Sequence, residues 1–165
     1  MFLIANEDAG GGQGRETLHR IRPLLSKDDG VAVTMSAGDA RVLAARAAAR
    51  GQDLIVALGG DGTVNEVVNG IAAAGSDTTL GIIPGGGGND FAWTLGIPAD
   101  PVEALAALRT GLPRLIDIGL LTFPPGETRR YVNTFGLGAS GHVAKLALAH
   151  GRKGGAYSYA IELIR

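Results

Sequence analysis

Cysteine is missing from all 165 residues of the chain, and aromatic side chains make up only 5% of it. The lack of cysteine excludes disulfide bonds, thiolate catalysis and cysteine-ligated zinc sites, and it is compatible with a reducing compartment. The chain also lacks the run of about 18 apolar residues that a membrane span needs, and its start, MFLIAN, has neither the basic residues nor the cleavage site of a signal peptide. We therefore expect a cytoplasmic protein without a transmembrane segment.

The chain has no excess of basic residues. It carries 15 Lys plus Arg against 16 Asp plus Glu, which gives a formal net charge of −1. Proteins that wrap nucleic acid usually present a basic face, so we expect no nucleic acid partner. By contrast, glycine is abundant, with 27 residues, and 45% of the residues are hydrophobic. That is enough apolar material for the core of one domain and the start of another.

Apolar runs alternate with helix-like patterns from the start of the chain to residue 110. Strand-like runs occupy residues 2–6, 31–35, 53–58 and 80–84. Apolar spacings of three and four residues, or alanine-rich sequence, predict helices over residues 15–25, 40–50, 63–74 and 102–109. This alternation predicts an α/β fold with a mostly parallel sheet flanked by helices, in which the loops that follow the strands gather at one edge.

The pattern changes near residues 111–117. The stretches RLIDIGLLTF and RRYVNTFGLG flank a Pro-Pro-Gly turn, which is typical of an antiparallel pair of strands. We expect an α/β nucleotide-binding domain over residues 1–113 and the beginning of a β-rich second domain, incomplete, over residues 114–165. GLGASG at 136–141 formally matches a dinucleotide-binding pattern, with Glu162 as its ribose-binding acid, but its antiparallel context disfavours this interpretation.

The first of two glycine-rich turns, GGDGT at residues 59–63, directly follows an apolar strand. Glycines there bring backbone N–H groups close to phosphate oxygens at the start of a helix. Asp61 is unexpected in such a cradle, because a carboxylate repels phosphate unless it works through a metal or accepts a proton. We interpret Asp61 as a metal-linked or acid/base residue. The alternative, in which Asp61 only caps the helix that follows, remains open.

The second glycine-rich turn, PGGGGND at residues 84–90, also follows a strand, so both turns are expected at the same edge of the sheet. Two facing glycine-rich loops predict a cleft between them. Asn89 and Asp90 have side chains that can hydrogen-bond a ribose or a phosphate-bearing ligand, and either can equally cap the next helix.

Four segments resemble the catalytic domains of diacylglycerol kinases and sphingosine kinases, including the bacterial lipid kinases of that group. They are, in chain order, IANEDAGGGQGRETL at 4–18, VAVTMSAGDA at 31–40, GGDGTVNEVVNG at 59–70 and PGGGGNDFAWTLGIP at 84–98. The resemblance implies the Rossmann-like α/β fold that these kinases share with NAD kinases. It also implies transfer of the γ-phosphate of ATP to a lipid hydroxyl with Mg²⁺, at the cytoplasmic side of a membrane surface. A homodimer is compatible with it.

Carried over residue by residue, the resemblance assigns a nucleotide site to the glycine-rich edge. The residues implied in nucleotide binding are Asn6, Thr34, Gly59, Gly60, Asp61, Gly62, Thr63, Val64, Asn65, Glu66, Gly86, Gly87, Gly88, Asn89 and Asp90. Asp61 is the implied catalytic residue and joins the Mg²⁺ network through water, while Glu66 supports the loop. In this family the second domain supplies most metal ligands, the general base and the lipid pocket, so we expect the chain to be a fragment.

Three positions depart from the family pattern: Glu7 replaces a frequent proline, Gly87 a common threonine, and Trp93 a frequent arginine. The missing threonine hydroxyl removes one hydrogen bond to ATP, of order 1 kcal/mol. Two alternatives for the function remain open. One is a kinase for a small molecule, similar to NAD kinases, which share the GGDGT loop; the other is an inactive remnant that binds a nucleotide or a partner chain.

Overall fold

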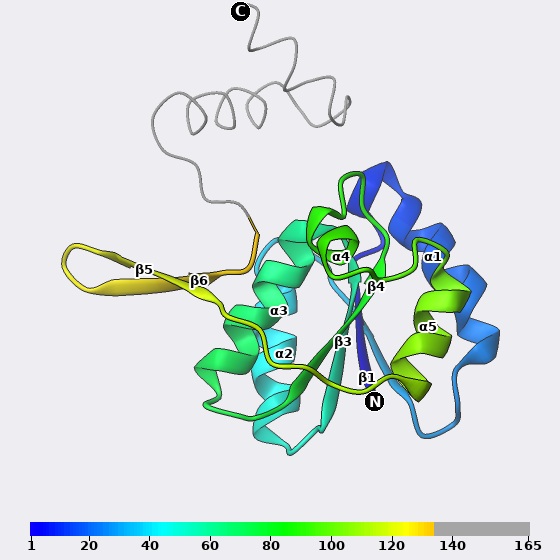
Figure 1. Cartoon of the computed structure of the whole chain (residues 1–165), viewed down its shortest axis with the longest axis horizontal. Helices are drawn as coiled ribbons and strands as arrows, with labels where there is room; N and C mark the ends of the chain where they lie inside the picture. Colours follow the sequence, from blue (N-terminus) through cyan, green and yellow to red (C-terminus); the bar gives the residue numbers. More distant parts are fainter. Residues whose placement is uncertain (134–165) are drawn as a thin grey trace, which may run out of the picture. The chain divides into compact units, whose positions relative to one another are not determined.

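Four parallel strands form a sheet in the computed structural model, which describes residues 1–133 (Figure 1). They are β1 (Phe2–Ala5), β2 (Gly30–Val33), β3 (Leu54–Gly59) and β4 (Thr79–Pro84), and their spatial order is β2-β1-β3-β4. All three strand pairs are parallel, which confirms the predicted sheet type. Pro84 has no N–H to donate, and it ends β4, a strand at the edge of the sheet.

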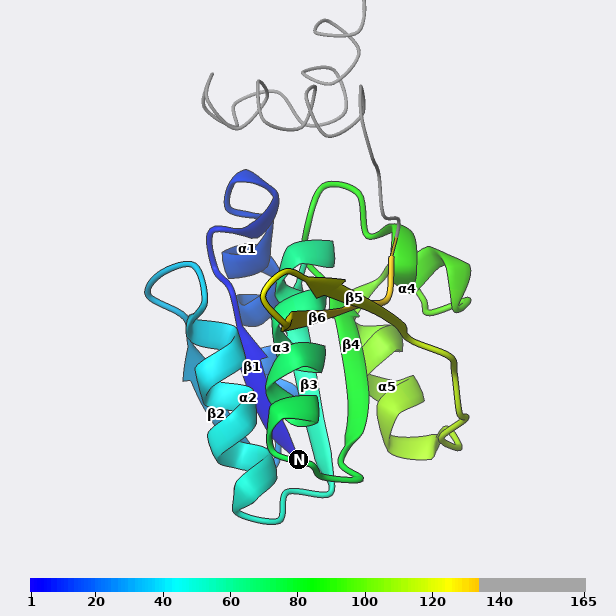
Figure 2. The same cartoon turned by 90° about the vertical axis from the view of Figure 1, so that its left-hand side faces the viewer.

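Helices cover both faces of this sheet (Figures 1 and 2). The α-helices among the described residues are α1 (Gln13–Ile21), α2 (Asp39–Ala49), α3 (Asp61–Ala73), α4 (Asp90–Thr94) and α5 (Pro101–Thr110), and the 3₁₀ turns are η1 (Ala9–Gly11) and η2 (Arg22–Leu24). The predicted helix over residues 15–25 therefore begins earlier and changes to a 3₁₀ turn at its end, where Pro23 lies in the first positions of η2. None of these helices has the length and apolar character needed to cross a membrane.

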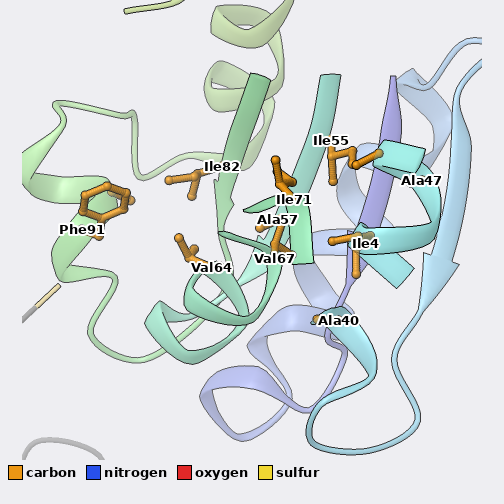
Figure 3. Packing of buried hydrophobic residues seen from close by; sticks show 13 residues of the cluster. Ile4, Ala40, Ala47, Ile55, Ala57, Val64, Val67, Ile71, Ile82 and Phe91 are labelled. Carbon is orange, nitrogen blue, oxygen red and sulfur yellow. The ribbon is translucent and has the colours of Figure 1, made fainter. Parts of the chain in front are cut away.

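The core lies in two layers because successive side chains of a strand point to opposite faces of the sheet. One layer joins the strands to α2, α3 and α4, and the other joins them to α1 and α5. Figure 3 shows the first layer, in which Ile4, Ile55 and Ile82 of the strands face Val64, Val67 and Ile71 of α3. Burial of each such side chain stabilises the fold by about 1.5–3 kcal/mol.

The antiparallel pair predicted after residue 113 is also present. Strands β5 (Gly119–Phe123) and β6 (Glu127–Tyr131) form a hairpin in which Leu121 lies opposite Arg129. Residues 1–133 form one compact unit that includes this hairpin. The domain boundary at residue 113 remains a prediction.

Candidate functional site

The loops that follow the four parallel strands meet at the carboxyl edge of the sheet. The backbone N–H of Asn6 donates to Leu58 O at 2.9 Å, and that of Thr34 donates to Ala5 O at 2.9 Å. The N–H of Gly85 donates to Gly59 O at 2.9 Å, which continues the pairing of β3 with β4 into both glycine-rich loops. The sheet thus brings together segments that are far apart in the sequence and that carry the predicted site residues.

The two glycine-rich loops touch backbone to backbone at their bases. A Cβ on Gly60 would lie 3.2 Å from Gly86 Cα, and a Cβ on Gly86 would lie 2.9 Å from Gly60 N. The cleft expected between the loops is therefore wrong at this point, because the absence of side chains is used for close packing. Gly62 and Gly87, at the tips of the loops, are exposed and have open space beside them. These tips are therefore the part of the two loops that is open to solvent.

Asp61 ties the first loop to the second. Its Oδ2 accepts the Asp90 N–H at 3.2 Å, and its Oδ1 accepts the Phe91 N–H at 3.0 Å. These are N–H groups of the first turn of α4, which lack partners within their own helix. A third donor, Asn133 Nδ2, lies 2.6 Å from Oδ1. Asp61 therefore caps α4 from another element.

The hydrogen bonds contradict a side-chain cap by Asp61 on its own helix and a side-chain cap by Asn89 on α4. The N-cap of α3 is Gly60, with no side-chain cap bond, so Asp61 does not cap its own helix through its carboxylate. Asn89 is the N-cap of α4, but its side chain makes no cap bond. Instead its amide closes the loop on itself, because Gly86 N donates to Asn89 Oδ1 at 2.9 Å and Asn89 Nδ2 donates to Gly86 O at 2.7 Å.

Asn6 and Thr63 connect the end of β1 to the first turn of α3. Asn6 Nδ2 donates to Thr63 Oγ1 at 3.1 Å, and a Cβ on Gly59 would lie 2.5 Å from the same hydroxyl oxygen. Thr63 is 5% exposed and Val64 is 2% exposed, with Val64 in the core. Of these predicted site residues, Thr63 and Val64 therefore face inward and offer a ligand only their backbone.

Glu66 and Asp39 hold the loop that follows β2, next to Thr34. Glu66 Oε1 accepts the Gly38 N–H at 3.0 Å, so Glu66 supports this loop. Asp39 Oδ2 accepts the N–H groups of Met35 at 2.8 Å and Ser36 at 2.9 Å. These hydrogen bonds, led by that from Met35, lower the pKa of Asp39 from its ordinary value of 3.8.

A cleft of about 430 Å³ opens on the side of the second loop that faces α1. It is lined by residues of α1, of the loop 84–90 and of α4, among them Gly86, Gly88, Asn89 and Asp90. At one rim Arg20 Nη2 and Asp100 Oδ2 form an ion pair at 2.6 Å. That arginine, together with the N–H groups of the next helix, lowers the pKa of Asp100. The predicted residues of the first loop do not line this cleft.

The acidic groups near the tips are Asp61 and Asp90. A Cβ on Gly88 would lie 3.2 Å from Asp61 Oδ2 and 3.4 Å from Asp90 Oδ1, so the two carboxylates share the space beside this glycine. No group of three His, Cys, Asp or Glu residues that could hold a metal occurs within residues 1–133. This part of the chain holds two neighbouring carboxylates, and Mg²⁺ commonly binds proteins through one or two carboxylates, waters and substrate phosphates.

The sequence did not single out Asn69 and Asn133, although both lie in the network around α3. Asn69 is four residues after Asn65 in the quoted stretch VNEVVNG, and its polarity in a helix with a largely buried face was the available signal. Nothing near Asn133 indicated its contact with Asp61. The disfavoured dinucleotide pattern at 136–141 and Glu162 lie outside the described residues.

Comparisons with known proteins agree with this arrangement. The model of the family described as diacylglycerol kinase catalytic domain matches residues 1–121. A diacylglycerol kinase of Bacillus subtilis (strain 168) is 53% identical over 87 residues, covering 52% of this chain and 29% of that protein. A diacylglycerol kinase of Staphylococcus saprophyticus is 34% identical over 148 residues, covering 88% of this chain and 46% of that protein.

Solved structures of diacylglycerol kinases also have a similar fold. A crystal structure of a diacylglycerol kinase from Bacillus anthracis str. Sterne superposes with a TM-score of 0.63 and 37% identity, over 71% of this chain and 44% of that one. The chain thus spans less than half the length of these relatives. Because the family model covers most of the chain, including both glycine-rich loops, the chain belongs to the diacylglycerol kinase catalytic domain family.

Proposed function

We propose that this chain is the nucleotide-binding part of an ATP-dependent lipid kinase that transfers the γ-phosphate of ATP to a lipid hydroxyl. In this reaction the lipid hydroxyl oxygen forms a bond to the γ-phosphorus, the bond to the departing ADP oxygen breaks, and the hydroxyl proton passes to a base. Phosphoryl transfer asks a protein mainly for positioning and for neutralisation of charge. The single observation that carries the proposal is the contact between two family-matched glycine loops at the carboxyl edge of the sheet, bridged by Asp61.

The phosphates of ATP would lie over the exposed tips of the loops. Gly62 belongs to the first turn of α3, whose N–H groups have no partner within the helix, and no side chain caps them. The helix dipole adds a partial positive charge at the same point. Gly62, Gly87 and Gly88 would expose backbone there without a Cβ, while Asn6 and Thr34 mark the adjacent ends of β1 and β2.

Mg²⁺ would supply charge neutralisation between the phosphates, and within residues 1–133 Asp61 is the residue best placed to support it. Its two carboxylate oxygens accept three hydrogen bonds from the protein, of about four that they can accept. That leaves room on Oδ2 for one water, which suits a contact to the metal through water. Asp90, exposed beside Gly88, would add a second carboxylate.

The lipid acceptor follows from the family and not from a lipid pocket within residues 1–133. The relatives that match are named diacylglycerol kinases, and we infer a diacylglycerol or a similar lipid alcohol as the substrate, reached at the surface of a membrane. An NAD kinase-like activity is the competing small-molecule reaction. The two differ in the acceptor and share the use of the glycine-rich loops.

The test is transfer of labelled γ-phosphate by the complete gene product, with diacylglycerol in mixed micelles and NAD offered in parallel. We expect label in the lipid, and loss of that transfer in Asp61→Ala. Arg129→Ala, on the exposed side of the β5-β6 hairpin, serves as the control and should keep its activity. Label in NAD and not in the lipid would contradict the lipid kinase and favour an NAD kinase-like activity. Transfer to neither acceptor would contradict both kinase activities and favour the inactive remnant that binds a nucleotide or a partner chain.

A further inference from the structure

The side chain of Asn69 on α3 holds the β5-β6 hairpin through backbone hydrogen bonds of the kind that a neighbouring strand would make. The Arg130 N–H donates to Asn69 Oδ1 at 2.9 Å, and Asn69 Nδ2 donates to Arg130 O at 2.8 Å. The same Nδ2 also donates to Asn65 O at 2.8 Å, within α3. One amide therefore satisfies both backbone groups of a residue in β6 and fixes the register of that strand along the helix.

That register delivers Asn133 to Asp61. Asn69 lies eight residues after Asp61 on α3, which corresponds to about 12 Å along the helix axis. Asn133 lies three residues after Arg130, in a bend just beyond the end of β6, and three residues can span at most about 10 Å. This reach is enough for the chain leaving β6 to come to the start of α3, where Asn133 Nδ2 lies 2.6 Å from Asp61 Oδ1. A slip by one residue would separate the two side chains.

Asn133 uses only the donor end of its side-chain amide. Its Oδ1 is buried and has no hydrogen-bond partner, whereas its Nδ2 makes the contact with Asp61. The reverse orientation would place an amide oxygen against a carboxylate oxygen, two acceptors without a proton between them. A buried polar atom left unpartnered is unfavourable, so packing alone gives no reason for an asparagine here. The contact that it makes is with the carboxylate that bridges both glycine-rich loops.

We propose that Asn133 is a positioning residue for Asp61, and that the clamp between Asn69 and the backbone of Arg130 sets its place. Asn133 orients the carboxylate so that it faces the first turn of α4 and leaves Oδ2 toward the loop tips. The β-rich part of the chain thereby controls the geometry of the nucleotide loops. The effect on nucleotide binding rests on the function proposed above; the effect on Asp61 does not.

The test measures hydrogen exchange of the backbone amides of residues 90 and 91, which donate to Asp61, by NMR on the whole 165-residue chain. Asn133→Ala and the equally sized Asn133→Asp both remove the donor, and we expect these amides to exchange at least about tenfold faster, as for the loss of one hydrogen bond to a charged group. Arg129→Ala, next to the clamp on the same strand, should leave them unchanged. Amides of α5 serve as the internal reference for global stability.

A second variant keeps Asn133 and removes the clamp that fixes the register of β6 along α3. Asn69→Ala should speed exchange at residues 90 and 91 as well, and this result would support the clamp even if the Asn133 variants fail to fold. Unchanged exchange at these two amides in folded Asn133 variants would overturn the proposal. In parallel, calorimetry with Mg²⁺ and ATP should show affinity weakened about three- to tenfold in Asn133→Ala. If the wild-type chain binds no ATP, the proposed function fails, while the exchange result still decides the role of Asn133.

Discussion

Two neighbouring glycines of the second loop should respond in opposite ways to the same substitution. A Cβ on Gly86 would clash with Gly60 Cα and lie 2.9 Å from Gly60 N, and these are backbone atoms that no rotamer change can move. A Cβ on Gly87 would have nothing within 4 Å, and the backbone there does not need a positive φ. Gly86→Ala must therefore separate the two glycine-rich loops, whereas Gly87→Ala adds a methyl group to open space.

The expected loss of stability depends on whether the added Cβ meets backbone atoms or a movable side chain. Overpacking a close contact costs about 1–3 kcal/mol, and because the obstacle is backbone we place Gly86→Ala at about 2–3 kcal/mol of lost stability. For a chain of this size that lowers the Tm by roughly 4–12 °C. Gly87→Ala should change stability by less than about 1 kcal/mol, with a stabilising sign if the unfolded chain loses freedom.

Urea unfolding and thermal melts of both variants measure the difference. Equal stabilities for Gly86→Ala and Gly87→Ala would refute the direct packing of the two loops. A large loss of stability in Gly87→Ala alone would contradict the open space that the structure shows beside Gly87.

Three further substitutions probe other parts of the structure. Gly70→Ala should cost about 2–3 kcal/mol in urea unfolding, because its Cβ would meet the Arg41 carbonyl where α2 and α3 are in contact; wild-type stability would contradict that packing. Gly62→Ala has free space and should keep or slightly raise stability, by up to about 1 kcal/mol, yet weaken ATP binding in calorimetry; unchanged affinity would remove the tip of α3 from the site. Arg20 lowers the pKa of Asp100, so the ionised carboxylate stabilises the fold above its ordinary pKa of 3.8, and this contribution is lost as the pH falls through the lower pKa of the folded state. The difference in stability between the wild type and Asp100→Asn should therefore shrink as the pH falls below 3.8, and a constant difference would be inconsistent with this ion pair.

Local sequence signals were enough to predict the main strands and helices and the sheet edge at which the glycine-rich loops gather. Apolar runs with glycine turns predicted the four parallel strands, because in parallel sheets the loops after the strands share one edge. The Pro-Pro-Gly turn predicted the β5-β6 hairpin for a similarly local reason, and the family match confirms the resemblance drawn from the glycine loops.

Local sequence patterns could not predict the contacts between segments that are distant in the chain. The alternative in which Asp61 caps its own helix is wrong, because its carboxylate caps α4, thirty residues away, where the sheet places β3 and β4 side by side. Its link to a metal stays a prediction. The glycines at 60 and 86 were assigned to a ligand cradle, whereas they also allow two backbones to touch. Asn133 gave no signal, since its role depends on the register that Asn69 imposes on β6.

The proposed nucleotide site can be tested most directly by isothermal titration calorimetry of the chain with ATP, in the presence and absence of Mg²⁺, for the wild type and Asp61→Ala. We expect binding that depends on Mg²⁺ and weakens about tenfold or more in the variant, since a carboxylate that supports the metal and both loops is lost. The absence of ATP binding by a folded wild-type chain, or equal affinity of the Asp61→Ala variant, would contradict a nucleotide site at the glycine-rich edge.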